Sequence, residues 1–208
     1  MSEYLSSLPD ILTRGLEFTL VISFCAMLIT VAGGLLLGVL RALHNRFLDA
    51  VIIAYVEVLR GIPLLVLMFF VFFGLPQLGI HLVPSKFREL QSVVAAIVAL
   101  GLWGAANGTE IVRGAIFSIS RGQTEAGTAL GLNWFQVMSS VILPQALRRM
   151  IPPFMSLFTA IVESSSLAAL IGVFDLLETV RTRVETAQQL WFPLLLTVML
   201  IYFFINYP

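Results

Sequence analysis

Two ionisable side chains, Arg60 and Glu163, interrupt long apolar runs of this sequence. At a rise of 1.5 Å per helical residue, they lie about 14 Å and about 18 Å from the polar ends of their runs. A charged group at that depth in a membrane is costly, and it indicates a functional site by default. A guanidinium there could bind a carboxylate, and a carboxylate could bind an ammonium or another cationic group. Three hydroxyl side chains that should face the protein interior or a cavity follow Glu163 directly: Ser164, Ser165 and Ser166.

Two further polar residues in apolar runs leave alternatives open. Glu57 stands one helical turn before Arg60, so these two side chains could form an internal ion pair instead of a binding site. Asn107 is a weaker candidate for a binding residue, because a single asparagine can simply bond to a neighbouring helix.

The composition indicates that these residues lie in a membrane protein. Of the 208 residues, 59% are hydrophobic and 12% are charged, and the mean hydropathy is +0.97, far outside the range of soluble globular proteins. About 20 apolar residues cross a bilayer core. Five segments meet or approach that length: 16–40, 51–75, 91–112, 150–170 and 190–207. The sequence therefore predicts an all-α integral membrane protein with five transmembrane helices.

Small residues and prolines predict local features of these spans. Gly34 and Gly38 form a small-xxx-small pair, which permits close approach of another helix. Pro63, and later Pro152 with Pro153, predict kinks, because each proline frees a backbone carbonyl that a partner must satisfy.

The distribution of positive charge predicts the orientation. Five spans put the two termini on opposite sides of the membrane. The longest segment between spans, 113–149, carries four arginines and neither lysine nor histidine, which favours the cytoplasm. We therefore expect the N-terminus outside and the C-terminus in the cytoplasm.

Within 113–149, the sequence predicts two short helices joined by a sharp turn. Thr124 could cap the first helix, with Glu125 in its first turn, where the helix dipole favours a carboxylate. Gly131 stands where a left-handed residue would end that helix, and Asn133 could cap the second. Pro144 should stop the second helix. A short rigid helix held outside the membrane indicates contact with another protein.

This segment resembles the cytoplasmic signature of ABC importer permeases, which reads Glu-Ala-Ala, three residues, Gly, nine residues, Ile, one residue, Leu-Pro. The matching residues here are Glu125, Ala126, Gly127, Gly131, Val141, Leu143 and Pro144. Gly127 and Val141 depart from the pattern by small changes in volume. Other stretches resemble the polar amino acid branch of that family: GLEFTLVIS, YVEVLRGIPLLV, EIVRGAI, SRGQTEAG and LPQALRRMIPP. The resemblance to this family of binding-protein-dependent transport system inner membrane components covers nearly the whole chain.

The resemblance implies a type I ABC importer permease fold, with residues 1–208 as one transmembrane domain and 113–149 as its cytoplasmic coupling segment. It implies a bacterial inner membrane protein that imports polar or charged amino acids by alternating access. Its partners would be a dimer of ABC ATPase subunits, a second permease in a homodimer or heterodimer, and an extracytoplasmic amino-acid-binding protein. ATP and magnesium would bind to the ATPase, and no cofactor to this chain. The expected coupling residues are Glu125, Ala126, Gly127, Leu130, Gly131 and Leu132.

The same resemblance suggests that Arg60 faces the α-carboxylate of an amino acid and Glu163 an amino or cationic group. Family members often carry Thr, Gln, Tyr and Lys where this chain has Ile62, Leu67, Asn107 and Glu163. This departure indicates either a different substrate with extra positive charge, or a second permease that makes most of the contacts.

Other functional classes receive less support. The chain has no nucleotide-binding G-x-x-x-x-G-K-[ST] run, so it should not be an enzyme itself. One cysteine and two histidines, His44 and His81, offer neither a metal site nor a nucleophile and base, and a net charge of zero gives no sign of nucleic acid binding. The remaining alternative is a stand-alone secondary transporter or channel for small solutes.

Overall fold

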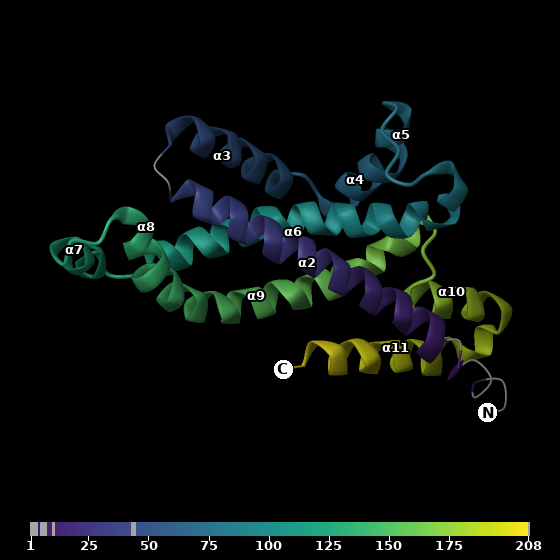
Figure 1. Ribbon diagram of the computed structural model, residues 1–208. Helices are drawn as coiled ribbons and strands as arrows, with labels where there is room; N and C mark the ends of the chain where they lie inside the picture. Colours follow the sequence, from purple (N-terminus) through teal and green to yellow (C-terminus); the bar gives the residue numbers. More distant parts are fainter. Residues whose placement is uncertain (1–3, 5–7, 10, 43–44, 208) are drawn as a thin grey trace. The chain divides into compact units, whose positions relative to one another are not determined.

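The computed structural model describes residues 4, 8–9, 11–42 and 45–207, and in these residues every regular element is a helix (Figure 1). His44 lies outside the described residues. The elements are η1 (Ile11–Gly15), α2 (Leu16–Arg41), α3 (Arg46–Gly61), α4 (Leu64–Phe69), η2 (Phe70–Gly74), α5 (Leu75–Gln77), η3 (Ser85–Leu90), α6 (Gln91–Phe117), α7 (Arg121–Ala129), α8 (Trp134–Val137), η4 (Met138–Ile142), α9 (Leu143–Ser165), η5 (Ser166–Ile171), α10 (Leu176–Thr186), η6 (Gln188–Leu190) and α11 (Trp191–Asn206). Here η marks π-helical and 3₁₀ turns.

The helices confirm the all-α membrane class. Among the described residues, four helical stretches are long and apolar enough to span a membrane: Ile11–Arg41, Ser85–Phe117, Trp134–Ile171 and Gln188–Asn206. Together, Arg46–Gly61 and Leu64–Gln77 meet the same test as one broken span. The described residues thus provide four spans, and the five that the sequence predicts if this bent pair counts as one.

The second span, which we predict over 51–75 with a kink at Pro63, is divided there into two helices. Helix α3 ends at Gly61, and α4 begins at Leu64 after Pro63, which has an extended ψ of 131°. Proline has no N–H to donate to the preceding turn, and it disfavours helical geometry in the residue before it. Pro63 therefore breaks the helix rather than bending it.

The predicted stop at Pro144 is wrong. Residues 134–171 are helical throughout, and Pro144 lies in the first turn of α9, where the missing N–H costs little. The preceding turn, η4, is a π-helix in which the Leu143 N–H bonds to the Met138 carbonyl. This wider turn admits the proline without ending the helix. Helix α9 also continues through Pro152 and Pro153.

The described residues form two packed units, each assembled from separate segments. Unit 1 takes its residues from Met1–Leu28, Ile62–Gly101 and Thr159–Pro208, and unit 2 from Ile29–Gly61 and Leu102–Phe158. We describe each unit by itself.

In unit 2, the second half of α2 packs closely on α6. A Cβ atom on Gly34 would lie 2.9 Å from the Gly108 Cα, and one on Gly38 would lie 2.5 Å from the Val112 Cβ. The small-xxx-small contact that the sequence predicts is therefore confirmed. Helix α3 also joins α6, since the Tyr55 hydroxyl donates to the Leu102 carbonyl at 2.8 Å.

In unit 1, α10 lies between η1 and α11 in one apolar core. Its buried residues are Ile11, Leu176, Val180, Leu194 and Val198. The helix starts at a buried N-cap, Asp175, whose carboxylate accepts the Glu178 N–H at 2.9 Å. This cap satisfies one of the free amides at the start of α10.

Candidate functional site

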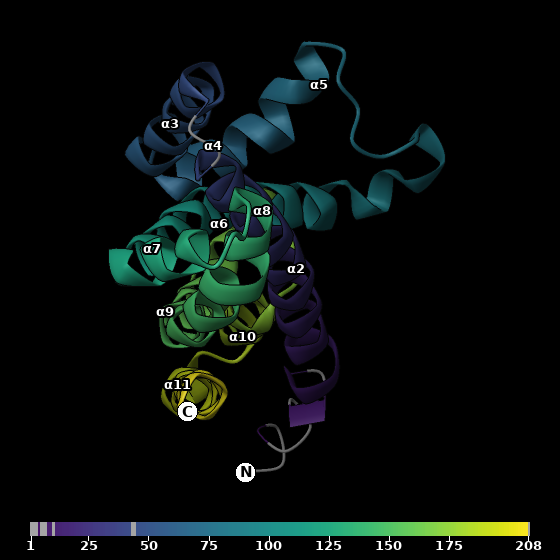
Figure 2. The same ribbon diagram turned by 60° about the vertical axis from the view of Figure 1, so that its left-hand side comes forward.

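Between two candidate spans the chain forms α7 and a sharp turn, and α8 then begins the helical stretch Trp134–Ile171 (Figures 1 and 2). Helix α7 begins at Arg121 after Ser120, so the expectation that Thr124 caps it is wrong. Thr124 lies inside the helix, where its carbonyl accepts the Thr128 hydroxyl at 3.0 Å. Glu125 is consequently in the second turn, not in the first as we expect from the sequence, and the helix dipole adds less to its stability there.

The turn after α7 matches the sequence prediction. Gly131 has φ of +83°, a left-handed conformation that other residues adopt only with strain. Asn133 and Gln136 then form a capping box at the start of α8, in which each side chain accepts the other residue's backbone N–H, at 3.0 Å and 2.9 Å. These local bonds fix the turn between α7, which is too short to be stable alone, and the start of the long helix over 134–171.

The inner face of this segment packs on the rest of unit 2. Gly127 is buried, and a Cβ atom on it would lie 2.9 Å from the Val137 Cγ2. Val137 belongs to an apolar cluster that includes Ile116 of α6, Ile142 of η4 and Met150 of α9. The segment is thus held rigidly at the ends of two spans.

The outer face of the segment exposes apolar side chains. Leu130, between two candidate spans, is 82% exposed, and Phe135, at the start of the stretch Trp134–Ile171, is 71% exposed. Beside them, a cavity of about 480 Å³ is lined by Ala42, Ile116, Phe117, Ile119, Arg121, Thr124, Glu125, Trp134, Val137, Met138 and Ile142. Rigid, exposed apolar groups next to a carboxylate are what a protein partner can bind.

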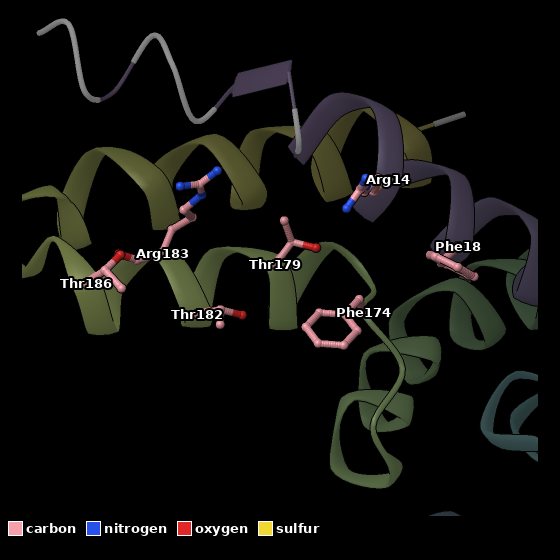
Figure 3. Close-up of a pocket in the computed structure, with 7 residues that line it drawn as sticks. All are labelled: Arg14, Phe18, Phe174, Thr179, Thr182, Arg183 and Thr186. Carbon is pink, nitrogen blue, oxygen red and sulfur yellow. The ribbon is translucent and has the colours of Figure 1, made fainter. Parts of the chain in front are cut away.

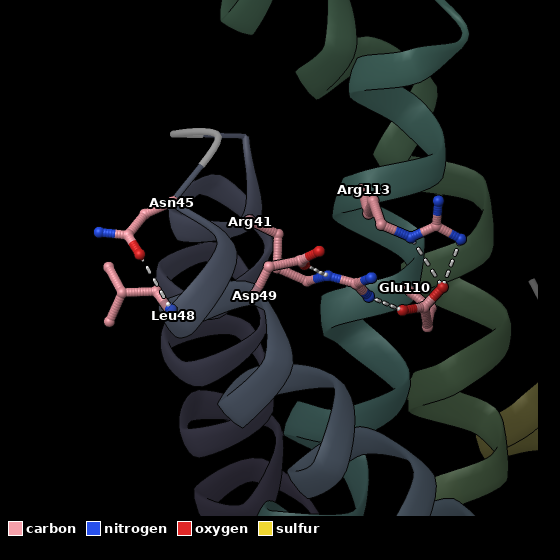
Figure 4. Close-up of polar contacts among 6 residues, drawn as sticks. All are labelled: Arg41, Asn45, Leu48, Asp49, Glu110 and Arg113. Atoms are coloured by element: carbon pink, nitrogen blue, oxygen red, sulfur yellow. Dashed lines mark hydrogen bonds and ion pairs between the residues drawn. The ribbon is translucent and has the colours of Figure 1, made fainter.

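Four charged residues join α2, α3 and α6 at one end of unit 2 (Figure 4). Arg41 pairs with Asp49 of α3 at 2.8 Å and with Glu110 of α6, and Glu110 also accepts from Arg113 at 2.6 Å and 2.9 Å. We call these four residues the charge network. The pairing explains Glu110 and Arg113 as structural residues. Sequence reasoning missed Arg41 and Asp49, because Glu110 is 69 positions from Arg41 and Asp49 lies beyond the end of α2, so neither pairing leaves a helical spacing pattern.

Arg60 and its neighbours lie in unit 2. Arg60 and Glu57 are both exposed on α3, and the ion pairs recorded for the described residues do not include one between them. The Asn107 amide donates to the Trp103 carbonyl of its own helix at 2.9 Å. Asn107 is therefore satisfied locally rather than by a neighbouring helix.

Glu163 and the serines lie in unit 1. Glu163 is exposed and Ser165 is buried. The Ser165 hydroxyl donates to the Val162 carbonyl at 2.8 Å, and the Ser166 hydroxyl donates to the Glu163 carbonyl at 2.7 Å. Glu163 borders a groove of about 580 Å³, with Ser166, Leu177, Leu195, Val198, Met199, Tyr202, Phe203 and Asn206. The carboxylate thus faces open space, and a role with Arg60 in one substrate pathway stays a prediction.

Comparisons with known proteins agree on one family. A family model described as "Binding-protein-dependent transport system inner membrane component" matches residues 34–207. The "Probable glutamine ABC transporter permease protein GlnP" of Bacillus subtilis is 35% identical over 207 residues, which are 99% of this chain and 89% of that relative. The "Glutamate/aspartate import permease protein GltJ" of Escherichia coli K12 is 35% identical over 167 residues, which are 78% of this chain and 68% of the relative.

Solved structures show the same fold. A crystal structure of an amino acid ABC transporter with histidines has a TM-score of 0.85 at 28% identity, and the match covers 98% of this chain and 90% of that one. The MetNI methionine ABC transporter in an inward-facing conformation has a TM-score of 0.71 at 21% identity, covering 96% and 93% of the two chains. The second likeness concerns the fold alone.

Proposed function

Since this chain belongs to the family of binding-protein-dependent transport system inner membrane components, we propose that it is the permease subunit of an importer for polar or charged amino acids. Relatives are named for glutamine and for glutamate and aspartate, which are polar or charged. The chain is an inner membrane component and a permease rather than an enzyme, like the relatives it matches.

The coupling role rests on the segment of α7, the turn and α8. Its proposed contact residues are Glu125, Ala126, Gly127, Leu130, Gly131 and Leu132. In support, Leu130 is 82% exposed on a helix whose position is fixed by Gly131 and by the capping box. Because the Leu130 side chain is exposed, it buries little apolar surface against the described residues of this chain. Insertion into a groove of an ATPase would remove it from water and would transmit ATPase closure to α6 and α9.

The complete transporter would contain partners that supply what this chain lacks. An ATPase dimer would hold ATP and magnesium, a second permease would complete the pathway, and an extracytoplasmic binding protein would deliver the amino acid. The segment 113–149 and the C-terminus would lie in the cytoplasm and the N-terminus outside. Arginines in that segment support this orientation.

The proposed pathway uses charged groups at membrane depth. Arg60 would face the substrate α-carboxylate, and Glu163, with Ser164, Ser165 and Ser166, would face an amino or cationic group; Glu57 and Asn107 would flank Arg60. Exposure of Arg60 and Glu163 in the single chain supports this assignment, because hydrocarbon would penalise either charge. Water, substrate or the second permease would cover them.

The experiment reverses the charge of Glu125. We would purify the tagged chain gently from its own membranes, identify the proteins that accompany it and measure ATP hydrolysis. Glu125→Arg should lose the ATPase or reduce hydrolysis coupled to substrate by about tenfold or more, because reversal places like charges at a specific interface. The matched control is Glu185→Arg on α10, an equally exposed carboxylate that should leave both measurements unchanged.

Two outcomes would contradict the proposal. The coupling assignment fails if Glu125→Arg and Glu185→Arg both co-purify with an ATPase and show the same rate of ATP hydrolysis. If the chain purifies alone and moves solute in liposomes without ATP, it is a stand-alone secondary transporter or channel.

A further inference from the structure

A pocket of about 610 Å³ opens in unit 1 between the start of α2 and one face of α10 (Figure 3). Its lining combines two arginines, three threonines and two phenylalanines: Arg14, Phe18, Phe174, Thr179, Thr182, Arg183 and Thr186. Of these seven described residues none is acidic. The transport function proposed above does not use this pocket.

Tight packing builds the pocket. Gly15 brings the start of α2 against α10, since a Cβ atom on it would lie 3.1 Å from both the Leu176 Cα and the Thr179 Oγ1. One turn further along α2, the buried Thr19 hydroxyl accepts the Leu176 N–H at 3.2 Å. These two contacts hold Arg14 opposite the threonine face of α10 (Figure 3). The pocket is therefore a fixed feature of unit 1.

The pocket is suited to an anion. The guanidinium groups of Arg14 and Arg183 both border it, and a guanidinium has five N–H donors, so it can hold an oxyanion in addition to another partner. Arg181, on the same helix, instead pairs with Glu178 and Glu185 at 3.6 Å and does not border the pocket. The pocket thus has one arginine from α10 and one from η1.

Hydroxyl oxygens add acceptors beside the guanidinium groups. Thr179 donates its hydroxyl proton to the Asp175 carbonyl at 2.7 Å, and Thr186 donates to the Arg183 carbonyl at 3.0 Å. Their donors are therefore used, while the oxygen lone pairs can still accept. A ligand that carries a phosphate and a neighbouring hydroxyl donor would match both kinds of group.

The surroundings place the pocket at the surface of a membrane. Arg14 stands at the start of one candidate span and α10 directly precedes another, whose helix begins at the exposed Trp191. Tryptophan is enriched at the level of lipid headgroups. Below the pocket, α2 exposes an apolar face with Val21, Phe24 and Leu28. An acyl chain could lie on that face while its headgroup occupied the pocket.

We propose that this pocket binds the phosphate of an anionic phospholipid, such as phosphatidylglycerol. Arg14 and Arg183 hold the phosphate oxygens, a threonine oxygen accepts a glycerol hydroxyl, and Phe18 and Phe174 contact the glycerol backbone and upper acyl carbons. The proposal is independent of the substrate and of the ATPase.

The test measures the melting temperature of the full chain, purified in detergent with its accompanying subunits and stripped of lipid. Phosphatidylglycerol, phosphatidylcholine and inorganic phosphate are added separately. Phosphatidylglycerol should raise the melting temperature, and the other two should not.

The variants test the two arginines. Arg14→Gln and Arg183→Gln should each raise the half-saturating concentration of phosphatidylglycerol about fivefold, which is the usual contribution of one arginine at an anionic membrane surface. Arg181→Gln is the matched control and should leave that concentration unchanged. Arg14→Lys, which keeps the charge and should fold normally, should fall between wild type and Arg14→Gln.

Several results would overturn the proposal. The first is a wild-type melting temperature that phosphatidylglycerol does not change, and the second is an equal rise with phosphatidylcholine. The third is a half-saturating concentration in Arg14→Gln and Arg183→Gln equal to that of the wild type. Equal protection by inorganic phosphate would assign the pocket to a free anion instead of a lipid. If the two arginine variants respond to lipid as the wild type does but their ATP hydrolysis is no longer stimulated by the binding protein, the pocket would instead bind an acidic protein surface.

Discussion

Arg60 and Glu163 are charged side chains within apolar spans, and among the described residues neither belongs to an ion pair, whereas the charge network satisfies its own members. A charge that no protein group neutralises must meet water, a ligand or a partner, since hydrocarbon excludes it. This difference separates the candidates for substrate binding from the structural charges.

The residue-scale prediction concerns Glu163→Gln. Removing the charge should lower uptake of amino acids with cationic side chains by about tenfold or more, because a hydrogen bond to a charged group contributes about 1.5–3 kcal/mol. Neutral polar substrates should change less. Uptake into proteoliposomes that contain the whole transporter measures the effect. Glu89→Gln, an exposed carboxylate in η3, is the control. Unchanged uptake of every accepted substrate would remove Glu163 from the pathway.

At the scale of elements, α10 begins with an unusual cap. Asp175 is fully buried, and its Oδ2 atom has no hydrogen-bond partner among the described residues. Burial raises the pKa of this carboxyl from 3.8 to about 6, with a further increase from Glu178 nearby, while the backbone N–H groups of Glu178 and Leu177 and the nearby Tyr202 hydroxyl oppose it. The folded state thus holds a proton on Asp175 more tightly than the unfolded state.

The element-scale prediction is that Asp175→Asn stabilises the protein at neutral pH. Because the folded pKa is raised, stability is lost as pH rises from about 4 to about 6, and the loss above that range amounts to about 3 kcal/mol at most. Asparagine caps helices as well as aspartate does, so it should keep α10 and remove this loss. Melting temperatures at about pH 4.5 and about pH 7.5 check this. The variant should exceed wild type at both pH values, by about 1 kcal/mol at about pH 4.5 and by about 3 kcal/mol at about pH 7.5, and Glu185→Gln should differ at neither. A lower melting temperature for Asp175→Asn at neutral pH would contradict it.

Helix boundaries show what the sequence could predict. The Gly131 turn and the Asn133 cap were predictable, because each depends on a local conformation that few residue types adopt. The roles of Thr124 and Pro144 were not, because Ser120 and the π-helical turn before Leu143 offered alternatives of similar local energy that packing decided. Pro63 indicated a disturbance, but not whether the helix would bend or break.

Candidate site residues were predictable to a similar degree. Charges such as Arg60 and Glu163 stand out in apolar runs, and the segment around Glu125 stands out by its spacing. The charge network and the Arg14 pocket depend on residues far apart in the chain, such as Arg41 with Glu110 and Arg14 with Arg183. Contacts of this kind arise only when the helices pack.

At the scale of the whole molecule, the helical stretch Trp134–Ile171 separates α7 from α10. If it crosses the membrane once, residues of these two helices must meet opposite compartments, whatever the arrangement of units 1 and 2. Arginines in 113–149 favour the cytoplasm for the α7 side, as proposed above. Two positions are suited to a test: Leu130 just after α7, which is 82% exposed, and Thr182 on α10, which is also exposed.

The whole-molecule prediction is that single cysteines at these positions label from opposite sides. In a Cys25→Ala background, a membrane-impermeant maleimide added to intact cells without an outer membrane barrier should modify Thr182→Cys. Labelling of Leu130→Cys should increase about tenfold or more when the membrane is opened, because the hydrocarbon core excludes a charged reagent from intact cells. Labelling of Cys25→Ala alone gives the background. Labelling of both cysteines in intact cells would contradict the single crossing by 134–171. Labelling of Leu130→Cys alone would reverse the orientation and place the proposed ATPase contact outside the cell, where no ATPase could use it.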